Sequence, residues 1–181
     1  MSDEIQTLYQ GRYLRLCQRG TWEYAERVNP QGAVVIVAVT PEDKVLLVEQ
    51  YRIPIQSRTL EFPAGLIGDL DAHADEGWEA SAQRELIEET GWSAARFESL
   101  IRGPSSAGMS TEDQHFVRAF DLTRVGPGGG DGSENIVVHE VPVAAVAAFV
   151  ADADARGYRI DPKVYAGLYF IERDRYGQAW R

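Results

Sequence analysis

The chain has 181 residues, 44% of them hydrophobic, which predicts one globular domain with a real core. Its formal charge of −10 argues against nucleic acid polymers and anionic membranes as partners, although a small phosphorylated substrate can still bind where a divalent cation lies between carboxylate and phosphate. No stretch approaches the roughly 20 apolar residues of a membrane helix, and the first residues lack a secretory signal, so we expect a cytoplasmic protein.

Strand patterns dominate the first fifty residues. Residues 11–27 alternate loosely between apolar and polar side chains, with a break at Arg19-Gly20, and predict an antiparallel hairpin. Two strongly apolar runs, residues 33–39 and 45–48, predict buried strands on either side of a polar turn.

The remainder of the chain alternates helix and strand patterns. Good helix formers cluster between Trp78 and Thr90, and Gly91 follows as a C-terminal stop, so we expect a helix of about three turns. The glycine-rich residues 126–133 predict a mobile loop. Further strands are predicted at residues 97–102, 115–122 and 136–138, and further helices at 143–155 and from the N-cap pair Asp161-Pro162 to Glu172.

The helix predicted at residues 78–90 carries several carboxylates. Because positions three and four apart share a helix face, Glu85, Glu88 and Glu89 should project side by side. Like charges at this spacing destabilise a helix by a few tenths of a kcal/mol per pair, a cost that a bound cation reverses, and oxygen ligands select Mg²⁺ or Mn²⁺. Arg84 lies four residues before Glu88 and can hold that carboxylate in place. Without further context, such a pattern is more often a solvated acidic face.

The context of these carboxylates resembles the signature of the Nudix hydrolases. Glu76, seven further residues and RELIEETGW at 84–92 are similar to the family pattern Gly-x5-Glu-x7-Arg-Glu-apolar-x-Glu-Glu-x-Gly-apolar. One feature departs from it, because Gly65 lies eleven positions before Glu76 where the pattern has six. A surface loop tolerates such an insertion at about 0.6 kcal/mol per doubling of its length. The helix geometry is therefore expected to be intact.

The flanks, from about residue 11 to 171, look like the ADP-ribose and ADP-sugar pyrophosphatase branch of this family. The resemblance implies an α/β fold, a Nudix-like α/β/α sandwich with a mixed sheet, plus N-terminal antiparallel strands. Residues 1–30 would form these strands, for dimerisation and substrate binding, and residues 31–181 the Nudix hydrolase domain. A homodimer is implied.

Metal-binding roles follow from the resemblance position by position. Glu85 and Glu89 would be the principal Mg²⁺ ligands, with Mn²⁺ as a substitute. Glu88 would be a further ligand or a supporting catalytic carboxylate, and the backbone carbonyl of Ala64 another ligand. Arg84, with Glu76, would orient these groups.

Three substrate-binding candidates lie within the hairpin predicted at residues 11–27. Tyr13 and Trp22 match strands that family members exchange between subunits, where two aromatic rings would sandwich the adenine; packing within the hairpin is the alternative. Arg27 is a weaker substrate-binding candidate.

Arg52 would contact the diphosphate, since a guanidinium can hold phosphate oxygens at two points. A surface salt bridge from Arg52 to Glu49 or Glu61 is the alternative interpretation.

The general base is expected downstream. Glu134 matches the loop from which the family presents a glutamate toward the metals, as base or ligand, and its glycine-rich approach would permit closure on the substrate. Two alternatives remain open: Glu112 and a base within the helix cluster itself.

The sequence therefore predicts Mg²⁺-dependent hydrolysis of the diphosphate bond in ADP-ribose or a related nucleoside diphosphate sugar, giving AMP and a sugar phosphate. One alternative is a Nudix hydrolase for another nucleotide, such as a GDP-sugar or a dinucleotide. The other is a non-catalytic sensor that binds ADP-ribose, against which the intact glutamates argue.

Overall fold

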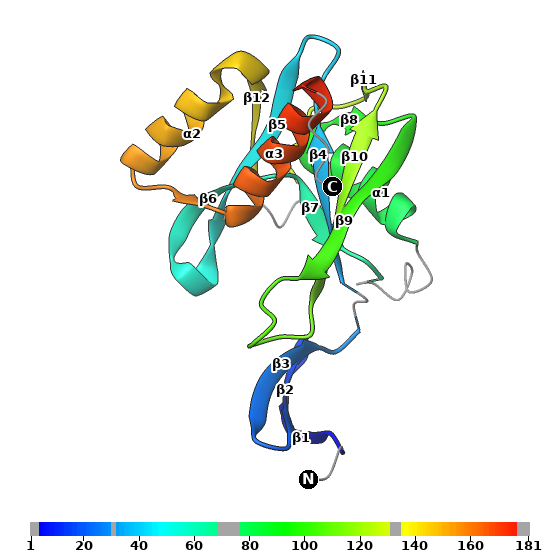
Figure 1. Ribbon diagram of the computed structural model, residues 1–181, viewed down its shortest axis with the longest axis vertical. Coiled ribbons are helices and arrows are strands. Elements are labelled where there is room, and N and C mark those ends of the chain that lie inside the picture. Colours follow the sequence, from blue (N-terminus) through cyan, green and yellow to red (C-terminus); the bar gives the residue numbers. More distant parts are fainter. Residues whose placement is uncertain (1–3, 30–31, 69–76, 131–134, 177–181) are drawn as a thin grey trace.

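The computed structural model describes residues 4–29, 32–68, 77–130 and 135–176, so two of the predicted site residues, Glu76 and Glu134, lie outside the described residues. Two four-stranded sheets with helices on both sides form the body, and a three-stranded sheet near the N-terminus projects from it (Figure 1).

The first sheet of the body has the strand order β7-β4-β10-β9. Strands β4 and β10 run parallel, whereas the other neighbours are antiparallel, so this is a mixed sheet. Its strands are β4 (Ala33–Ala38), β7 (Ala64–Leu66), β9 (Arg96–Pro104) and β10 (Asp113–Phe120).

The second sheet has the order β12-β5-β6-β13, in which only β6 and β13 are parallel. Its strands are β5 (Lys44–Arg52), β6 (Ser57–Glu61), β12 (Val137–Pro142) and β13 (Arg159–Ile160). The short 3₁₀ helix η1 (Ile53–Ile55) joins β5 to β6, and two short strands, β8 (Trp92–Ser93) and β11 (Thr123–Arg124), pair with each other.

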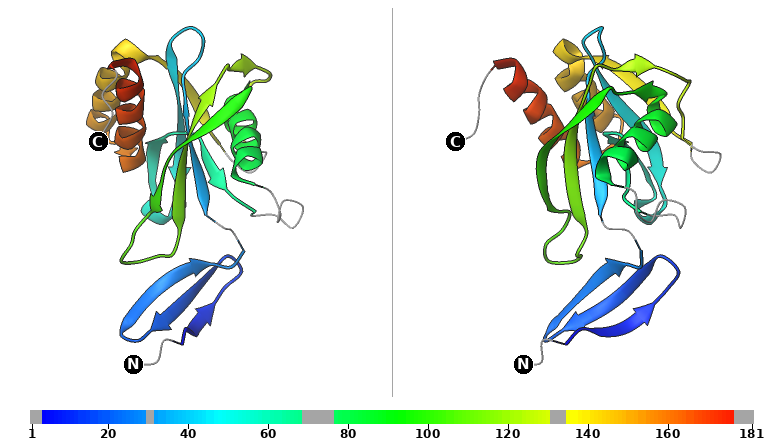
Figure 2. Two further views of the ribbon diagram at one scale, coloured as in Figure 1. Left: turned by 45° about the vertical axis from the view of Figure 1, so that its right-hand side comes forward. Right: turned by 90° about the vertical axis from the view of Figure 1, so that its right-hand side faces the viewer.

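Helices cover both sides of the sheets, as Figure 2 shows: α1 (Trp78–Thr90) lies on one side, and α2 (Val146–Ala155) and α3 (Pro162–Tyr176) on the other. The apolar sequence of β4 is unbroken because its alternate side chains face opposite sides of the sheet, and both sides are covered by a core. Val35 and Val37 belong to the core under α2 and α3, whereas Val34 and Ile36 belong to the core under α1. The predicted α/β sandwich is confirmed.

The N-terminal sheet has one strand more than the predicted hairpin. The hairpin is present as β2 (Leu14–Arg19) and β3 (Trp22–Arg27), and its turn contains Gly20. The additional strand β1 (Gln6–Gln10) pairs antiparallel with β2.

The helix limits follow the predicted capping residues. Helix α1 ends before Gly91, which is left-handed with φ of 74°. The Asp161 side chain accepts the backbone N–H of Lys163 at 2.8 Å and caps α3, which runs past Glu172 to Tyr176. A short 3₁₀ helix, η3 (Val143–Ala145), precedes α2. In the described part of the chain, every helix is too short or too polar to cross a bilayer.

Candidate active site

Two of the clustered glutamates meet the backbone of strand β7. The N–H of Ala64 donates to Glu89 Oε2 at 3.0 Å. The Cα of Gly65 lies directly against the Glu85 carboxyl group, so that a side chain at position 65 would overlap it. The absence of a Cβ at Gly65 thus lets the carboxylates of Glu85 and Glu89 approach one short stretch of backbone.

Arg84 holds the outer part of the same face. Its Nη1 donates to Glu85 Oε1 at 2.6 Å and to Glu88 Oε2 at 3.3 Å, and its Nη2 donates to the Leu66 carbonyl at 3.3 Å. The exposed fraction of the side chain is 12% for Glu85 but 46% for Glu88. Glu85 and the buried Glu89 therefore point inward, whereas Glu88 lies toward solvent.

The oxygen donors at Ala64–Gly65 fit a divalent cation. Within the described ranges, no three His, Cys, Asp or Glu side chains are grouped closely enough to hold a metal by themselves. A hard cation such as Mg²⁺, however, is commonly bound by one or two carboxylates, with water and substrate oxygens completing its shell. Glu85 and Glu89 can supply such a pair of carboxylates, and the backbone carbonyl of Ala64 is the third donor that the sequence predicts.

A cavity of about 520 Å³ adjoins this donor set. Its wall combines cations, which suit phosphate oxygens, with carboxylates, which suit metal ions. The charged residues that line it are Arg27, Arg52, Glu61, Glu85, Glu112, Asp161 and Lys163.

Arg52 lines the cavity while paired with a buried carboxylate. Its Nε and Nη2 donate to the two oxygens of Glu61 at 2.7 and 2.8 Å, and the Thr59 hydroxyl donates to Glu61 Oε1 at 2.5 Å. Burial by itself would raise the pKa of Glu61, but the hydrogen bonds from Arg52 and Thr59 and the charges of Arg52 and Lys163 together outweigh burial and lower it. The alternative ion pair with Glu61 is thus present, and it holds the guanidinium at the cavity wall.

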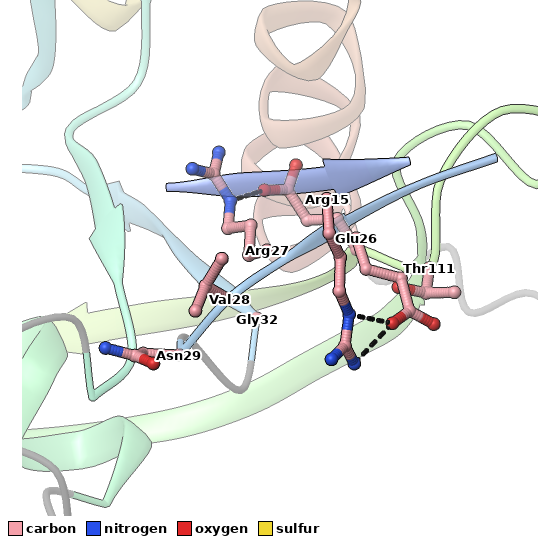
Figure 3. Close-up of a pocket in the computed structure, with 8 residues that line it drawn as sticks. Arg15, Glu26, Arg27, Val28, Asn29, Gly32 and Thr111 are labelled. Atoms are coloured by element: carbon pink, nitrogen blue, oxygen red, sulfur yellow. Dashed lines mark hydrogen bonds and ion pairs between the residues drawn. The ribbon is translucent and has the colours of Figure 1, made fainter. Parts of the chain in front are cut away.

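A second, smaller cavity of about 330 Å³ lies where β3 meets the body (Figure 3). Arg27 and Glu112 form an ion pair and line both cavities. Arg15 and Glu26 form another pair, with 2.7 Å between Arg15 Nε and Glu26 Oε2. The structure therefore brings Arg27 and Glu112 to the candidate site, bound to each other.

The two aromatic candidates lie away from both cavities of their own chain. Tyr13 and Trp22 are largely exposed on the N-terminal sheet and line neither cavity. A substrate-binding role for Tyr13 or Trp22 would therefore require a substrate bound by another copy of the chain.

Lys163 was not predicted as a site residue, yet it lines the larger cavity and pairs with Asp161. It lies in the first turn of α3, where the helix dipole disfavours a cation. A lysine that breaks this local rule was the available sequence signal, because such exceptions concentrate at functional sites.

Comparisons with known proteins identify the family and the fold of the chain. A family model for the NUDIX domain matches residues 29–162. A solved structure described as an ADP compounds hydrolase superposes with a TM-score of 0.75 at 22% identity, covering 97% of this chain and 94% of that one. At this identity, the likeness supports the fold alone.

Curated relatives include a methanol dehydrogenase activator from Bacillus methanolicus, 32% identical over 67% of this chain and 66% of that protein. An ADP-ribose pyrophosphatase from Bacillus subtilis is 36% identical over 54% and 50%, respectively. A GDP-mannose pyrophosphatase from Pectobacterium atrosepticum is 33% identical over 67% and 64%. The match thus spans about half to two thirds of these relatives' lengths. Because the family model covers residues 29–162, most of the sequence, the chain belongs to the NUDIX domain family.

Proposed function

We propose that the protein hydrolyses the diphosphate bond of ADP-ribose, or of a related nucleoside diphosphate sugar, giving AMP and a sugar phosphate. The observation that carries this proposal is the approach of Glu85 and Glu89 to Ala64–Gly65 at the wall of a cavity that also presents cations. The relatives named ADP-ribose pyrophosphatase support the choice of substrate.

In this proposal Glu85, Glu89 and the Ala64 carbonyl hold Mg²⁺, with Mn²⁺ as a substitute, and Glu88 gives further carboxylate support. When bound, the metal lowers the pKa of an attacking water and neutralises charge on the leaving phosphate. Arg84 orients the cluster, because it bridges Glu85, Glu88 and the carbonyl of Leu66. The residues of the site thus bind the metal, orient the substrate and neutralise phosphate charge, and positioning and charge stabilisation are most of what phosphoryl transfer requires of a protein.

The cations of the cavity receive the substrate. Arg52, which Glu61 holds in place, contacts the diphosphate, and Lys163 and Arg27 add positive charge to the same wall. Glu134 is the proposed general base. Glu112 is the less favoured choice, because its carboxylate is already paired with Arg27.

The proposal further divides the chain at residues 30 and 31, with the N-terminal strands serving dimerisation and the remainder forming the hydrolase domain. In a homodimer, Tyr13 and Trp22 of one subunit would stack on the base bound by the other. We infer a cytoplasmic location, in keeping with a small nucleotide substrate.

A GDP-sugar is the second candidate substrate, because some relatives are GDP-mannose pyrophosphatases of similar identity. The carboxylate cluster acts at the diphosphate and not at the base, so it does not distinguish ADP-sugars from GDP-sugars. A sensor without activity is disfavoured, since Glu85 and Glu89 are both present and both point inward.

Product analysis against ADP-ribose, GDP-mannose and a dinucleotide, with and without Mg²⁺, tests the proposal. We expect AMP and ribose 5-phosphate from ADP-ribose in equal amounts, and only with the metal. Faster release of GMP from GDP-mannose than of AMP from ADP-ribose would identify a GDP-sugar as the preferred substrate. Tight binding of ADP-ribose without any product would favour the sensor and refute hydrolysis.

A further inference from the structure

The C-terminal end of helix α1 is capped by a distant loop. The last turn of a helix leaves carbonyl groups without partners inside the helix. Ile87 O accepts the N–H of Gly91 at 2.9 Å, but the next two carbonyls have partners far along the chain. Gly130 N donates to Glu88 O at 3.0 Å, and Gly129 N donates to Glu89 O at 2.8 Å. Two residues of the carboxylate cluster are thus capped through their backbone by the glycine-rich segment.

The fit at this contact requires glycine at position 128. Gly128 has φ of 71°, in the left-handed region, and its Cα lies against the backbone of the last turn of α1. A Cβ there would lie 2.7 Å from Glu89 O and 2.8 Å from Gly91 N, and closer still to the carbonyl carbon of Thr90. These are backbone atoms, which cannot move aside without shifting the helix end.

Glu89 depends on this cap more than Glu85 does. Glu85 lies a full turn earlier and is held by Arg84 and by its packing on Gly65. Glu89 precedes the last residue of α1 by one position, where helices fray unless they are tied down. Its carbonyl is held by Gly129 and its carboxylate by Ala64, so both ends of the residue are fixed.

We propose that the Gly128–Gly130 turn is a positioning element for metal binding, which keeps the last turn of α1 and the Glu89 carboxylate in place. This inference rests on the proposed function in taking Glu89 as a metal ligand. A metal ligand has to be held within about 0.5 Å of its working position, and loss of outer supporting contacts typically costs about 10–100-fold in metal affinity or activity. Coupling between two sites is reciprocal, so metal binding also stabilises the turn.

Gly128→Ala, with Gly126→Ala as the matched control, separates positioning from simple stabilisation. Gly126 precedes the turn, has no positive φ, and a Cβ there would meet nothing within 4 Å. In Gly128→Ala we expect the Mn²⁺ dissociation constant to rise and kcat to fall, each by about tenfold or more, while KM for ADP-ribose at saturating metal changes less than about twofold. Gly126→Ala should match the parent protein. A Gly128→Ala protein with a lower Tm but unchanged metal affinity and kcat would refute the proposal.

Hydrogen exchange on the unmodified protein tests the same coupling even where Gly128→Ala does not fold. Saturation with Mn²⁺ should slow exchange of the Gly129 and Gly130 amide protons by about tenfold or more. Unchanged exchange at both amides under saturating Mn²⁺ would overturn the proposal. If the protein binds Mn²⁺ and protects these amides but yields no product from nucleotide sugars, the proposed function fails while the positioning role stands.

Discussion

Two arginine–glutamate pairs join strands β5 and β6 but face opposite sides of the sheet. Arg52 and Glu61 lie on the side of the cavity. Arg58 and Glu49 lie on the other side, where His139 also bonds to Glu49 Oε2 at 2.9 Å. The two glutamates are similarly buried and the two arginines are similarly part-exposed. The pairs therefore differ mainly in position, because Arg52 and Glu61 line the cavity and Arg58 and Glu49 do not.

Arg52→Ala and Arg58→Ala therefore form a matched comparison. Each leaves a buried carboxylate without its cation, so both should lower the free energy of unfolding, by about 1–3 kcal/mol. Only Arg52→Ala should raise KM for ADP-ribose, by about tenfold or more, because in the proposed function Arg52 contacts the diphosphate and Arg58 does not. Steady-state kinetics and thermal unfolding measure the two effects. Equal KM values in the two variants would remove Arg52 from the binding site.

The proximity of Glu85 and Glu89 could be predicted from the sequence, because their spacing along one helix is visible in the chain. Other neighbours at the candidate site could not be predicted in this way. The sequence left two possible partners for Arg52, Glu49 and Glu61, because both lie on the hairpin of β5 and β6. The strand register decides between them, since it places Arg52 and Glu61 on the same face of the sheet. Lys163 reaches the cavity through the packing of α3, which local sequence does not encode.

At the scale of elements, strands β5 and β6 each carry a buried carboxylate, Glu49 and Glu61, whose charge depends on its neighbours. Burial alone would raise the pKa of Glu49, yet its hydrogen bonds from His139 and Arg58 lower it below the ordinary value of 4.5. The pKa of Glu61 is lowered in the same way. A carboxylate with a depressed folded pKa stabilises the fold above its unfolded pKa, and this contribution disappears as the pH falls through the folded pKa.

We therefore expect Tm to be nearly constant from pH 8 to about 5 and to decline below about pH 4.5. Glu49→Gln should unfold at a lower temperature at pH 7 and show a shallower decline in acid, because one of the two groups no longer titrates. Calorimetry across this pH range makes the measurement. A Tm that stays constant down to pH 3 would contradict the assignment of these two pairs.

The elements themselves were predictable to the extent that their patterns are local. Helix α1 was found to the residue, because helix formers and a left-handed Gly91 bound it. The apolar runs of β4 and β5 were recognised as buried strands, but their division between two sheets was not, since both faces of each are apolar. Strands of two or three residues, such as β8, β11 and β13, are too short to show a period.

At the scale of the molecule, the N-terminal sheet projects from the body (Figure 1). Large apolar side chains on it are exposed. Its backbone joins the body by bonds such as Ala25 N to Met109 O, at 2.8 Å. Exposed apolar patches of this kind mark interaction surfaces. The exposed large side chains of these strands, and of the residues directly before β1 and β2, are Ile5, Leu8, Tyr9, Tyr13, Leu14, Leu16 and Trp22.

A homodimer is accordingly predicted, with twice the chain mass of 20.1 kDa by light scattering. Trp22→Ala should raise KM for ADP-ribose without lowering the dimer mass, because in the proposal this ring stacks on the base bound by the partner. A monomer with full activity would remove both the exchanged-strand arrangement and the proposed role of Trp22.

In the proposed function, Glu85 and Glu89 form the metal-binding part of a diphosphate hydrolase, and the double variant Glu85→Gln with Glu89→Gln removes both carboxylates. Glu79→Gln, in the exposed first turn of the same helix, is the control. With ADP-ribose and Mg²⁺, the double variant should lose turnover by about 100-fold or more while circular dichroism shows an intact fold, and the control should keep its activity. Full Mg²⁺-dependent turnover in a correctly folded double variant would refute the metal-binding role of Glu85 and Glu89.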